Sequence, residues 1–249
     1  MKVSAVVVSH GHADEVERLV PILAPQVDEL VLVANVPGSV RGEPAPVLRN
    51  ARPLSFAENV NQGIRATSGD LVLVSNPDAV PGPDAVATLR AFMESHRRAG
   101  IAGPQMRWPD GRWQPSRRRF PTVTGTLFRR TPLRRLAGPY AQRAHYQLDE
   151  RPTEPVQADW LLGASLLLRR EMLDELGGFD GGFRMYGEDI DLAYRAAQAG
   201  WERWYVPAAI VTHDYAAIVD RSFLTRHTWW HLRGMARFVR KHPERLRAL

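Results

Sequence analysis

Runs of aliphatic and β-branched residues alternate with helical segments over the first hundred residues, and this alternation constrains the fold most strongly. The runs at 3–9, 29–34 and 71–75 are largely apolar on both faces, which is typical of strands buried inside a parallel sheet. Helices are predicted at 15–23, 56–66 and 83–98. Strands that alternate with helices indicate an α/β fold with a mostly parallel sheet, in which the loops after the strands meet at one edge and bind ligands.

The second half of the chain gives weaker signals. Short strands are predicted at 101–106 and 112–115, around the turn 108–111. The stretch 116–155 is rich in Arg and Pro, and we expect it to be irregular, as a solvated connection or a mobile loop on the acceptor side. The remaining predictions are a short strand at 47–50, a strand leading into a helix over 157–169, a short helix at 170–176, a strand at 204–212 and an amphipathic helix at 223–241.

Composition excludes several classes of protein. With 249 residues the chain can form one large domain or two small ones. It has no cysteine, which excludes disulfides, thiolate metal sites and cysteine nucleophiles and fits a reducing cytosol. No run of about eighteen apolar residues occurs, and polar residues from His10 onward interrupt the first apolar run too early for a secretion signal. We therefore expect a cytoplasmic protein.

The net charge of +6 is concentrated in two segments. Eight Arg and no acid lie between Arg112 and Arg135, and the segment 221–249 has seven Arg and one Lys against the single acid Glu244. Such segments indicate anionic partners: nucleotide phosphates, a phospholipid surface or nucleic acid. No nucleic-acid-binding motif or pattern of stacking aromatics accompanies the charge, so we expect no nucleic-acid partner.

Three acids stand close together between Gly177 and Leu192. Glu188, Asp189 and Asp191 follow a turn rich in glycine and aromatics and begin an apolar-periodic helix, where the helix dipole favours negative charge. A helix start with an acidic first turn is the simpler interpretation. The Glu-Asp-Ile-Asp sequence has more acid than a cap requires, however, and the preceding glycines let the backbone bend toward a ligand. We predict the catalytic centre here.

Polar clusters at 76–78, at Glu188-Asp189 and at His213 follow or precede elements that point toward the same sheet edge. Asp and His together suit Mn²⁺ or Mg²⁺, and such an ion can neutralise a diphosphate leaving group. A carboxylate such as Asp189 can take a proton from an attacking hydroxyl. Each cluster alone has a simpler interpretation, a plain turn or a surface histidine. Their combination and order predict one site.

The sequence resembles the family-two glycosyltransferases of GT-A fold, particularly their rhamnosyltransferase-like branch. The matching segments are Val-Val-Val-Ser-His at 6–10, Phe-Ala-Glu-Asn-Val-Asn-Gln-Gly at 56–63, the run ending Asn-Pro-Asp at 68–78, Arg-Arg-Phe-Pro-Thr at 118–122, and the segments 159–170, 177–180, 188–192, 199–201 and 211–213. The resemblance implies a Rossmann-like, three-layer α/β/α domain over 1–220. Residues 1–100 would form its nucleotide-binding half and 101–220 its acceptor half, followed by a basic amphipathic helix at 221–249.

The resemblance also implies roles for individual residues. Asp189 would be the general base of an inverting single displacement, and Glu188 would orient the acceptor or the base. Asp78 and His213 would hold the metal on the diphosphate, with Asn76 in place of the first acid of an Asp-x-Asp motif. The nucleotide-sugar pocket would contain Ser9, His10, Asn35, Asn59 and Gly63, and the acceptor floor Trp160, Gly163 and Ala164. Simpler alternatives are a surface amide for Asn59, helix packing for Gly63 and a core position for Trp160.

The implied activity is metal-dependent transfer of rhamnose or another hexose from a dTDP- or UDP-linked donor to a hydroxyl of a glycan or polyprenyl-linked glycan, in the synthesis of cell wall or polysaccharide. One departure is that the second strand ends Ala34-Asn35-Val36-Pro37, where the family usually has an acid. A non-catalytic nucleotide-sugar-binding module is therefore the alternative. The sequence lacks the Gly-x-Gly-x-x-Gly motif of dinucleotide-binding sites and the Gly-Lys-Ser/Thr motif of P-loops, so neither kind of site is expected. It also lacks the glycine-rich opening loop of sugar nucleotidyltransferases, which argues against that class.

The last predicted helix leaves two interpretations open. Trp229 and Trp230 can pack the helix onto the body of the domain, which we favour. Alternatively, Trp and Arg on an amphipathic helix can lie on an anionic membrane at the inner face of the cell envelope, or on a partner subunit.

Overall fold

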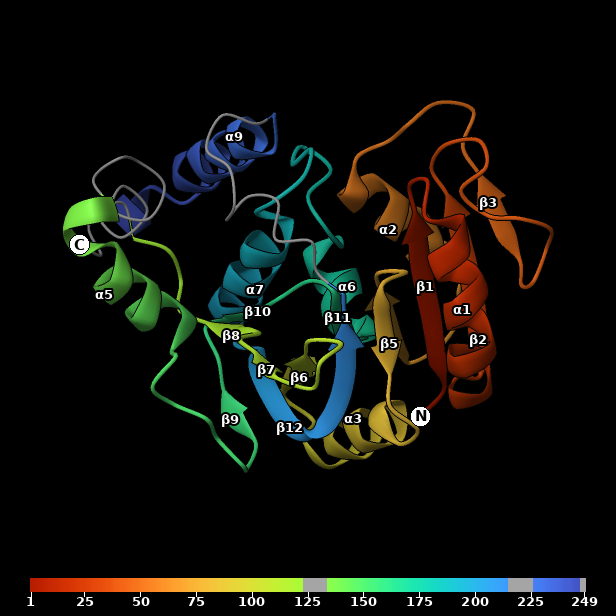
Figure 1. The fold of residues 1–249 in the computed structure, drawn as a ribbon, viewed down its shortest axis with the longest axis horizontal. Helices are drawn as coiled ribbons and strands as arrows, with labels where there is room; N and C mark the ends of the chain where they lie inside the picture. Colours follow the sequence, from red (N-terminus) through yellow and green to blue (C-terminus); the bar gives the residue numbers. More distant parts are fainter. Residues whose placement is uncertain (123–133, 215–225, 247–249) are drawn as a thin grey trace.

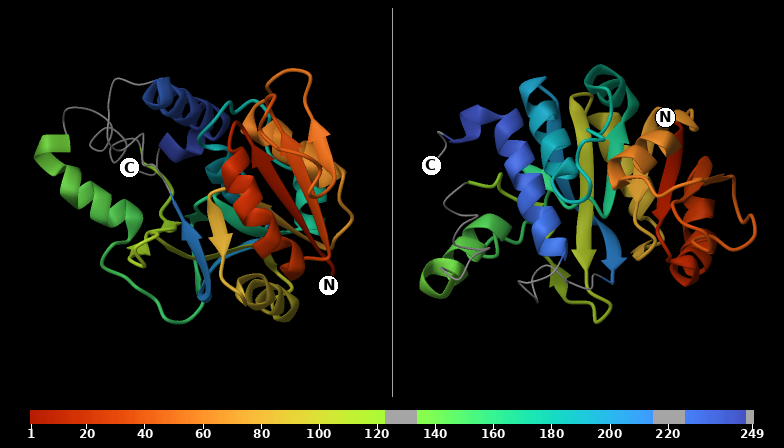
Figure 2. Two further views of the ribbon diagram at one scale, coloured as in Figure 1. Left: turned by 45° about the vertical axis from the view of Figure 1, so that its right-hand side comes forward. Right: turned by 90° about the horizontal axis from the view of Figure 1, so that it is seen from above.

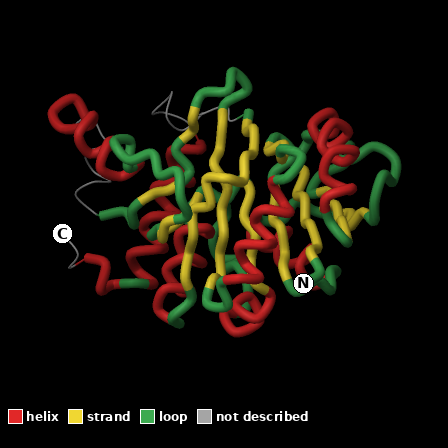
Figure 3. The backbone as a smooth tube through the Cα atoms, turned by 90° about the horizontal axis from the view of Figure 1, so that it is seen from below, coloured by secondary structure: helices red, strands yellow, loops and turns green. Residues whose placement is uncertain are grey.

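The computed structural model describes residues 1–122, 134–214 and 226–246. A ten-stranded mixed sheet crosses the molecule (Figure 1). Its main path runs in the order β3 (Val47–Arg49), β2 (Glu29–Ala34), β1 (Val3–Ser9), β4 (Leu71–Ser75), β11 (Ser165–Arg169), β6 (Ala99–Arg107), β12 (Glu202–His213) and β5 (Ala79–Pro81). Two short strands lie off this path: β7 (Trp113–Gln114) pairs with β6, and β9 (Val156–Gln157) pairs with β12. Figure 3 shows the strands side by side across the molecule.

Strand direction follows from the connections. The pairs β1–β2, β1–β4, β2–β3 and β6–β12 are parallel, as βαβ crossovers require. Strand β11 runs antiparallel between β4 and β6. A separate two-stranded sheet joins β8 (Arg117–Arg118) to β10 (Trp160–Leu161). The predicted α/β fold with a mostly parallel sheet is confirmed.

Helices cover both faces of the sheet, because alternate residues of each strand face opposite ways. Val6 and Val8 of β1 belong to one apolar cluster and Val7 to the other. The helices α1 (Ala13–Leu23) and α3 (Ala85–Ser95) pack in the cluster of Val7. The opposite cluster contains side chains of α2 (Phe56–Arg65), α6 (Arg170–Leu176), α7 (Glu188–Gln198) and α9 (Arg226–Lys241). Figure 2 shows α9 beside α7, and this layering is the predicted three-layer α/β/α arrangement.

Local sequence accounts for the placement of α2. Ser55 accepts a hydrogen bond from the backbone N–H of Glu58, and the Glu58 carboxylate accepts one from the N–H of Ser55, which forms a capping box. Gly63 lets α2 approach the sheet, because a Cβ at this position would lie 2.2 Å from Cγ1 of Val6. The described residues also form short 3₁₀ helices at Ala24–Gln26 and Pro243–Leu246.

The expectation of an irregular stretch at 116–155 was wrong in its described part. This stretch contains β8 and the helix α5 (Arg134–Tyr146), while 123–133 lie outside the described residues. Gly138 and Pro139 within α5 weaken the helical pattern of the sequence. The expectation of solvated Arg side chains also fails for Arg117, which is buried and whose Nη2 lies 2.6 Å from Oε2 of Glu150.

The last helix packs through residues other than those expected. Met235 and Phe238 are buried against the body of the domain, whereas Trp229 is 65% exposed. Trp230 is half-buried beneath the guanidinium of Arg184, whose Cζ lies 5.0 Å from the ring centroid. The interpretation that Trp229 packs onto the body was therefore wrong. None of the helices in the described ranges is long and apolar enough to cross a membrane.

Candidate functional site

Two chain segments far apart in sequence meet where β4 and β12 end. Nε2 of His213 lies 3.6 Å from Oδ1 of Asp78. The backbone N–H of Asp214 donates a hydrogen bond of 3.1 Å to the carbonyl oxygen of Asp78. Gln114 of β7 orients the imidazole, since its Oε1 lies 2.9 Å from Nδ1 of His213. With Oε1 of Gln114 as the acceptor, Nδ1 of His213 is the donor, and Nε2 is the ring nitrogen that faces Asp78. The structure thus brings the two predicted metal ligands together.

The electrostatics of this pair favour a bound cation. Burial raises the pKa of Asp78, although the nearby His213 opposes the shift. Burial likewise lowers the pKa of His213. The Asp78 carboxylate would therefore gain from a nearby positive charge, and the neutral His213 imidazole has a nitrogen lone pair that can bind a cation. A carboxylate oxygen and a neutral imidazole nitrogen fit Mn²⁺ or Mg²⁺ chemically. Within the described residues, no group of three or more His, Cys, Asp or Glu side chains converges on one point, so the protein would supply only part of a coordination shell.

The acids predicted as catalytic lie at the start of α7. Tyr186 and Gly187 have φ values of 70° and 101°, and this left-handed turn ends directly at Glu188. Asp189 accepts hydrogen bonds at Oδ2 from the N–H of Gly163, at 3.2 Å, and at Oδ1 from that of Ile190, at 2.9 Å. These bonds fix the orientation of the Asp189 carboxylate at the helix N-terminus.

The two neighbouring acids have different surroundings. Glu188 is buried, and its Oε2 has no hydrogen-bond partner among the described residues. Burial and the negative charge of Asp189 raise the pKa of Glu188 to about 8, so this carboxyl group keeps its proton to a higher pH than an ordinary glutamate does. Burial also raises the pKa of Asp189, but the positive charge of Arg118 opposes that shift. Asp189 is therefore the acid of the pair that has a cation to stabilise its charged form.

Arg118 connects the two halves of the site. Its Cζ lies 4.8 Å from the ring centroid of Tyr146 and 5.0 Å from that of Trp160. Burial raises the pKa of Asp189, and the positive charge of Arg118 opposes that shift. Burial lowers the pKa of His213, and the charge of Arg118 adds to that shift. The sequence analysis assigned no individual role to Arg118. The signal that locates it is its pairing with Trp160 across β8 and β10, which spacing alone does not reveal.

Backbone contacts join the remaining acceptor-side residues to this centre. The N–H of Asn76 donates to the carbonyl of Ala164 at 2.8 Å, and Gly163 binds Asp189 as described. Gly163 has little free space, because a Cβ there would lie 3.2 Å from Oδ2 of Asp189. Trp160 is 3% exposed and donates from Nε1 to the carbonyl of Arg119 at 2.9 Å. Its predicted contact with an acceptor stays a prediction.

The predicted nucleotide-binding side chains form an internal polar network near the ends of β1 and β2. Nδ2 of Asn35 lies 2.9 Å from Nδ1 of His10, and Oδ1 of Asn35 accepts from Nδ2 of Asn50 at 3.0 Å. Asn50 also donates to Oδ1 of Asn59, which is fully buried. Ser9 donates to the Ser39 carbonyl at 2.7 Å. Asn50 was missed by the sequence analysis, and direct contact of this network, or of Gly63, with a nucleoside stays a prediction.

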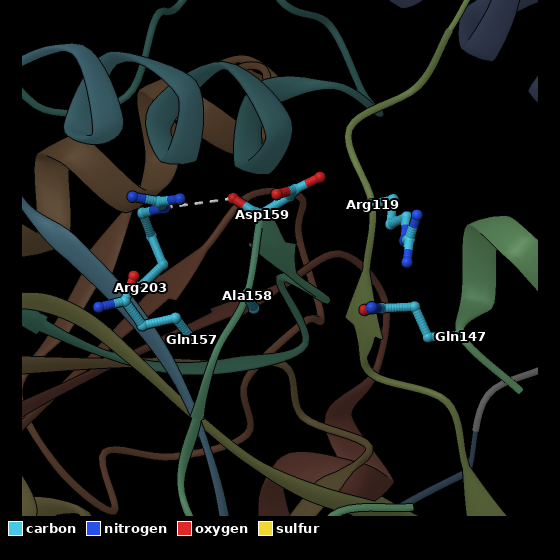
Figure 4. A pocket seen from close by; sticks show the side chains of 6 residues that line it. All are labelled: Arg119, Gln147, Gln157, Ala158, Asp159 and Arg203. Carbon is cyan, nitrogen blue, oxygen red and sulfur yellow. Dashed lines mark hydrogen bonds between the residues drawn. The ribbon is translucent and has the colours of Figure 1, made fainter. Parts of the chain in front are cut away.

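A polar cavity of about 330 Å³ lies beside β8, β9 and β12, away from the ends of β1 and β2 (Figure 4). In the figure, Asp159 lies between Arg203 on one side and Arg119 with Gln147 on the other. Its full lining is Arg119, Gln147, Gln157, Ala158, Asp159 and Arg203. None of the predicted site residues lines it, so the cavity adds nothing to the assignment of the catalytic centre.

The Glu188→Gln protein is expected to lose less stability than the wild type between about pH 5.5 and about pH 7.5. Between the ordinary pKa of 4.5 and about 8, folded Glu188 keeps a proton that the unfolded chain releases. The free energy of unfolding of the wild type therefore falls as pH rises, by up to about 1.4 kcal/mol per pH unit from Glu188. The Glu188→Gln protein lacks this contribution. Denaturant unfolding at both pH values measures the difference. Glu171→Gln, an exposed acid of α6, is the control; equal pH slopes in all three proteins would contradict the assignment.

Comparison with known proteins identifies the family. A model of glycosyltransferase-like family 2 matches residues 14–238. The chain belongs to this family. The N-acetylglucosaminyl-diphospho-decaprenol L-rhamnosyltransferase of Mycobacterium tuberculosis is 39% identical over 158 residues, which cover 61% of the chain and 49% of that relative. The present chain thus spans about half the length of that relative. Rhamnosyltransferase WbbL of Escherichia coli is 26% identical over 259 residues, covering 94% of the chain and 91% of the relative.

A solved structure supports the fold of this family-2 chain. The crystal structure of GalNAc-T7 with UDP, GalNAc and Mn²⁺ matches with a TM-score of 0.70 at 19% identity, covering 96% of this chain and 48% of that one. The predicted family and the GT-A fold are both confirmed.

Proposed function

We propose that this family-2 protein transfers a sugar, with inversion, from a nucleotide-diphosphate donor to an acceptor hydroxyl. The observation that carries the proposal is the position of Asp189, whose oriented carboxylate lies beside Glu188 and near Arg118. Asp189 would accept the proton of the acceptor hydroxyl as its oxygen attacks the anomeric carbon. The bond from that carbon to the diphosphate oxygen breaks in the same step, and the diphosphate leaves on the opposite face. Glu188 would keep its proton and orient the acceptor.

A divalent cation, Mn²⁺ or Mg²⁺, would be held by Asp78 and His213 together with the diphosphate of the donor. The fit rests on two side chains that lie close together, the Asp78 carboxylate and the His213 imidazole. A bound cation would favour the charged form of Asp78 and the neutral form of His213. When bound, the ion neutralises negative charge on the leaving diphosphate. Arg118 would add a fixed positive charge between this pair and Asp189.

The names of the relatives guide the choice of donor and acceptor. Both are rhamnosyltransferases, and one is named for an acceptor linked to decaprenol through a diphosphate. We propose a dTDP- or UDP-linked rhamnose or other hexose as donor and a hydroxyl of a glycan or polyprenyl-linked glycan as acceptor. The test is transfer from a panel of dTDP-, UDP- and GDP-sugars to a short polyprenyl-diphosphate N-acetylglucosamine, with products identified by mass spectrometry. Binding of a donor without any product would favour the non-catalytic module instead.

We propose that the outer face of α9 contacts an anionic membrane surface, where a polyprenyl-linked acceptor would lie. Trp229 and Leu232 are 65% and 38% exposed. Arg233 and Arg240 are exposed at the same helical spacing, and the sequence 226–241 has no acid. Exposed apolar side chains flanked by Arg suit the interface of an anionic bilayer. The protein would then act at the inner face of the membrane.

The Trp229→Ser/Leu232→Ser protein is expected to bind phosphatidylglycerol vesicles about tenfold more weakly than the wild type, because two apolar side chains no longer enter the interface. Co-sedimentation with phosphatidylglycerol and phosphatidylcholine vesicles measures the affinity. Ile22→Ser removes an apolar side chain of similar exposure, 42%, from α1 and serves as the control. Equal binding of all three proteins would exclude this face as the contact.

A further inference from the structure

Helix α9 contacts both ends of the segment 180–191, Asp180 through Arg237 and Asp191 through Lys241, although about fifty residues separate the helix from this segment in sequence. This segment, here called the catalytic segment, contains the left-handed turn before α7 and both acids of the proposed site. Figures 1 and 2 show α9 lying along α7. The contacts fall on the inner face of α9, opposite the exposed Trp229 and Leu232.

The closest approach is between Gly234 and Tyr186. A Cβ at residue 234 would lie 2.2 Å from the backbone oxygen of Tyr186, a distance that no side chain can have from a carbonyl group. Tyr186 has a φ of 70°, which a non-glycine residue adopts only when its surroundings hold it there. Next to it, a Cβ at Gly187 would lie 3.2 Å from Cε of Met235. The glycine in α9 thus lets the helix rest directly on the turn that leads into Glu188.

Charged side chains hold both ends of the catalytic segment against α9. At the first end, Asp180 accepts from Nη2 of Arg237 at 2.9 and 3.0 Å and from Nζ of Lys241 at 2.9 Å. At the other end, Asp191 is fully buried, and its Oδ1 lies 2.8 Å from Nε2 of His242 and 2.9 Å from Nζ of Lys241. Lys241 therefore bridges the two ends, with Glu188 and Asp189 between them.

We infer that α9 is a positioning element of the active site: the Gly234–Tyr186 contact and the Asp180 and Asp191 ion pairs set the place of Asp189. The inference rests on the proposed function, since it assigns α9 a part in the same transfer. It gives the last helix a role that is separate from membrane contact, because the two roles use opposite faces. A shift of a catalytic group by about 1 Å can cost about 10²-fold in rate, so a small movement of this turn has a measurable effect.

The test compares Gly234→Ala on the inner face with Ala236→Gly on the exposed face of the same helix. Alanine is more favourable than glycine inside a helix, so Gly234→Ala raises Tm if the residue has no close neighbour. With the contact to Tyr186, Gly234→Ala is expected to lower Tm and to reduce kcat about tenfold or more, while the Kd for the donor nucleotide stays within about twofold. With a water-soluble acceptor, for which membrane contact has no part, Ala236→Gly is expected to lower Tm and leave kcat unchanged.

A second pair of variants covers the case in which Gly234→Ala fails to fold. Arg237→Met keeps an unbranched side chain but removes the guanidinium, which forms the ion pair with Asp180 and whose Cζ lies 5.3 Å from the ring centroid of Phe183. This variant is expected to reduce kcat at unchanged nucleotide Kd. Arg237→Lys restores the charge and should recover part of the loss. An active wild type whose kcat is unaffected by both Gly234→Ala and Arg237→Met would overturn the positioning role alone. A wild type that transfers no sugar from any donor would overturn the proposed function, and the positioning role with it.

Discussion

The Asp189→Asn protein is expected to transfer sugar about 10²- to 10⁴-fold more slowly than the wild type, which is the usual range for loss of a general base. Asparagine keeps the size of the side chain and one oxygen that can accept from Gly163 or Ile190, so the start of α7 should keep its structure. An amide cannot take the proton of the acceptor hydroxyl. The loss should therefore appear in kcat, measured from initial rates of product formation.

Binding of the donor separates this result from unfolding. The Asp189→Asn protein should keep the wild-type Kd for the nucleotide, because Asp189 is proposed to contact the acceptor and not the nucleotide. Asp174 is an exposed acid of α6, so Asp174→Asn is the matched control and should keep full activity. A kcat within about threefold of wild type in Asp189→Asn would show that another group accepts the proton, since loss of a general base costs far more.

Replacing Asp78 by asparagine is expected to weaken metal-dependent nucleotide binding by at least about tenfold, the lower end of the loss measured even for residues that only support metal ligands. The Asp78 carboxylate is one of the two protein groups proposed to hold the ion. Its Oδ1 lies 3.6 Å from Nε2 of His213, so both atoms could bind the same ion. Asparagine keeps the shape of the turn after β4 but has no negative charge.

Thermal unfolding measures this effect, since a ligand that binds only the folded state raises Tm. The wild type is screened with dTDP, UDP and GDP, each with Mn²⁺, with Mg²⁺ and with a chelator. The nucleotide that raises Tm in a metal-dependent way identifies the donor class. Asp78→Asn should lose the metal-dependent part of the shift, whereas Asp174→Asn should retain it. A metal-dependent shift that survives in Asp78→Asn would place the ion elsewhere.

The frame of the site could be predicted because it follows from buried strands. Each of β1, β2 and β4 is a largely apolar run, and such runs identify strands inside a parallel sheet without knowledge of their partners. Parallel strands end at one edge, so the polar residues after β4 and β12 were expected to meet. Asp78 and His213 do so. The glycine-rich approach to Glu188 and Asp189 likewise indicated a turn before a helix, which the structure contains.

Other parts of the site depend on pairings between distant residues. Arg118 lies near enough to affect the pKa of Asp189 because β8 pairs with β10, and Gln114 contacts His213 because β7 folds back onto β6. Strands of two residues have no periodicity, so the sequence does not reveal such pairings. The outward direction of Trp229 was missed for a related reason: an amphipathic helix with aromatic residues on two faces does not show which face the body covers.

The anomeric configuration of the first product tests the central claim most directly. The wild type is incubated with its nucleotide sugar and acceptor, and the new glycosidic bond is assigned by NMR coupling constants before any further reaction. A single displacement assisted by Asp189 predicts that the wild type forms a product whose anomeric configuration is opposite to that of the donor sugar. The Asp189→Asn protein should form little of this product. A product with retained configuration would contradict the account, because one attack on the face opposite the diphosphate cannot produce it.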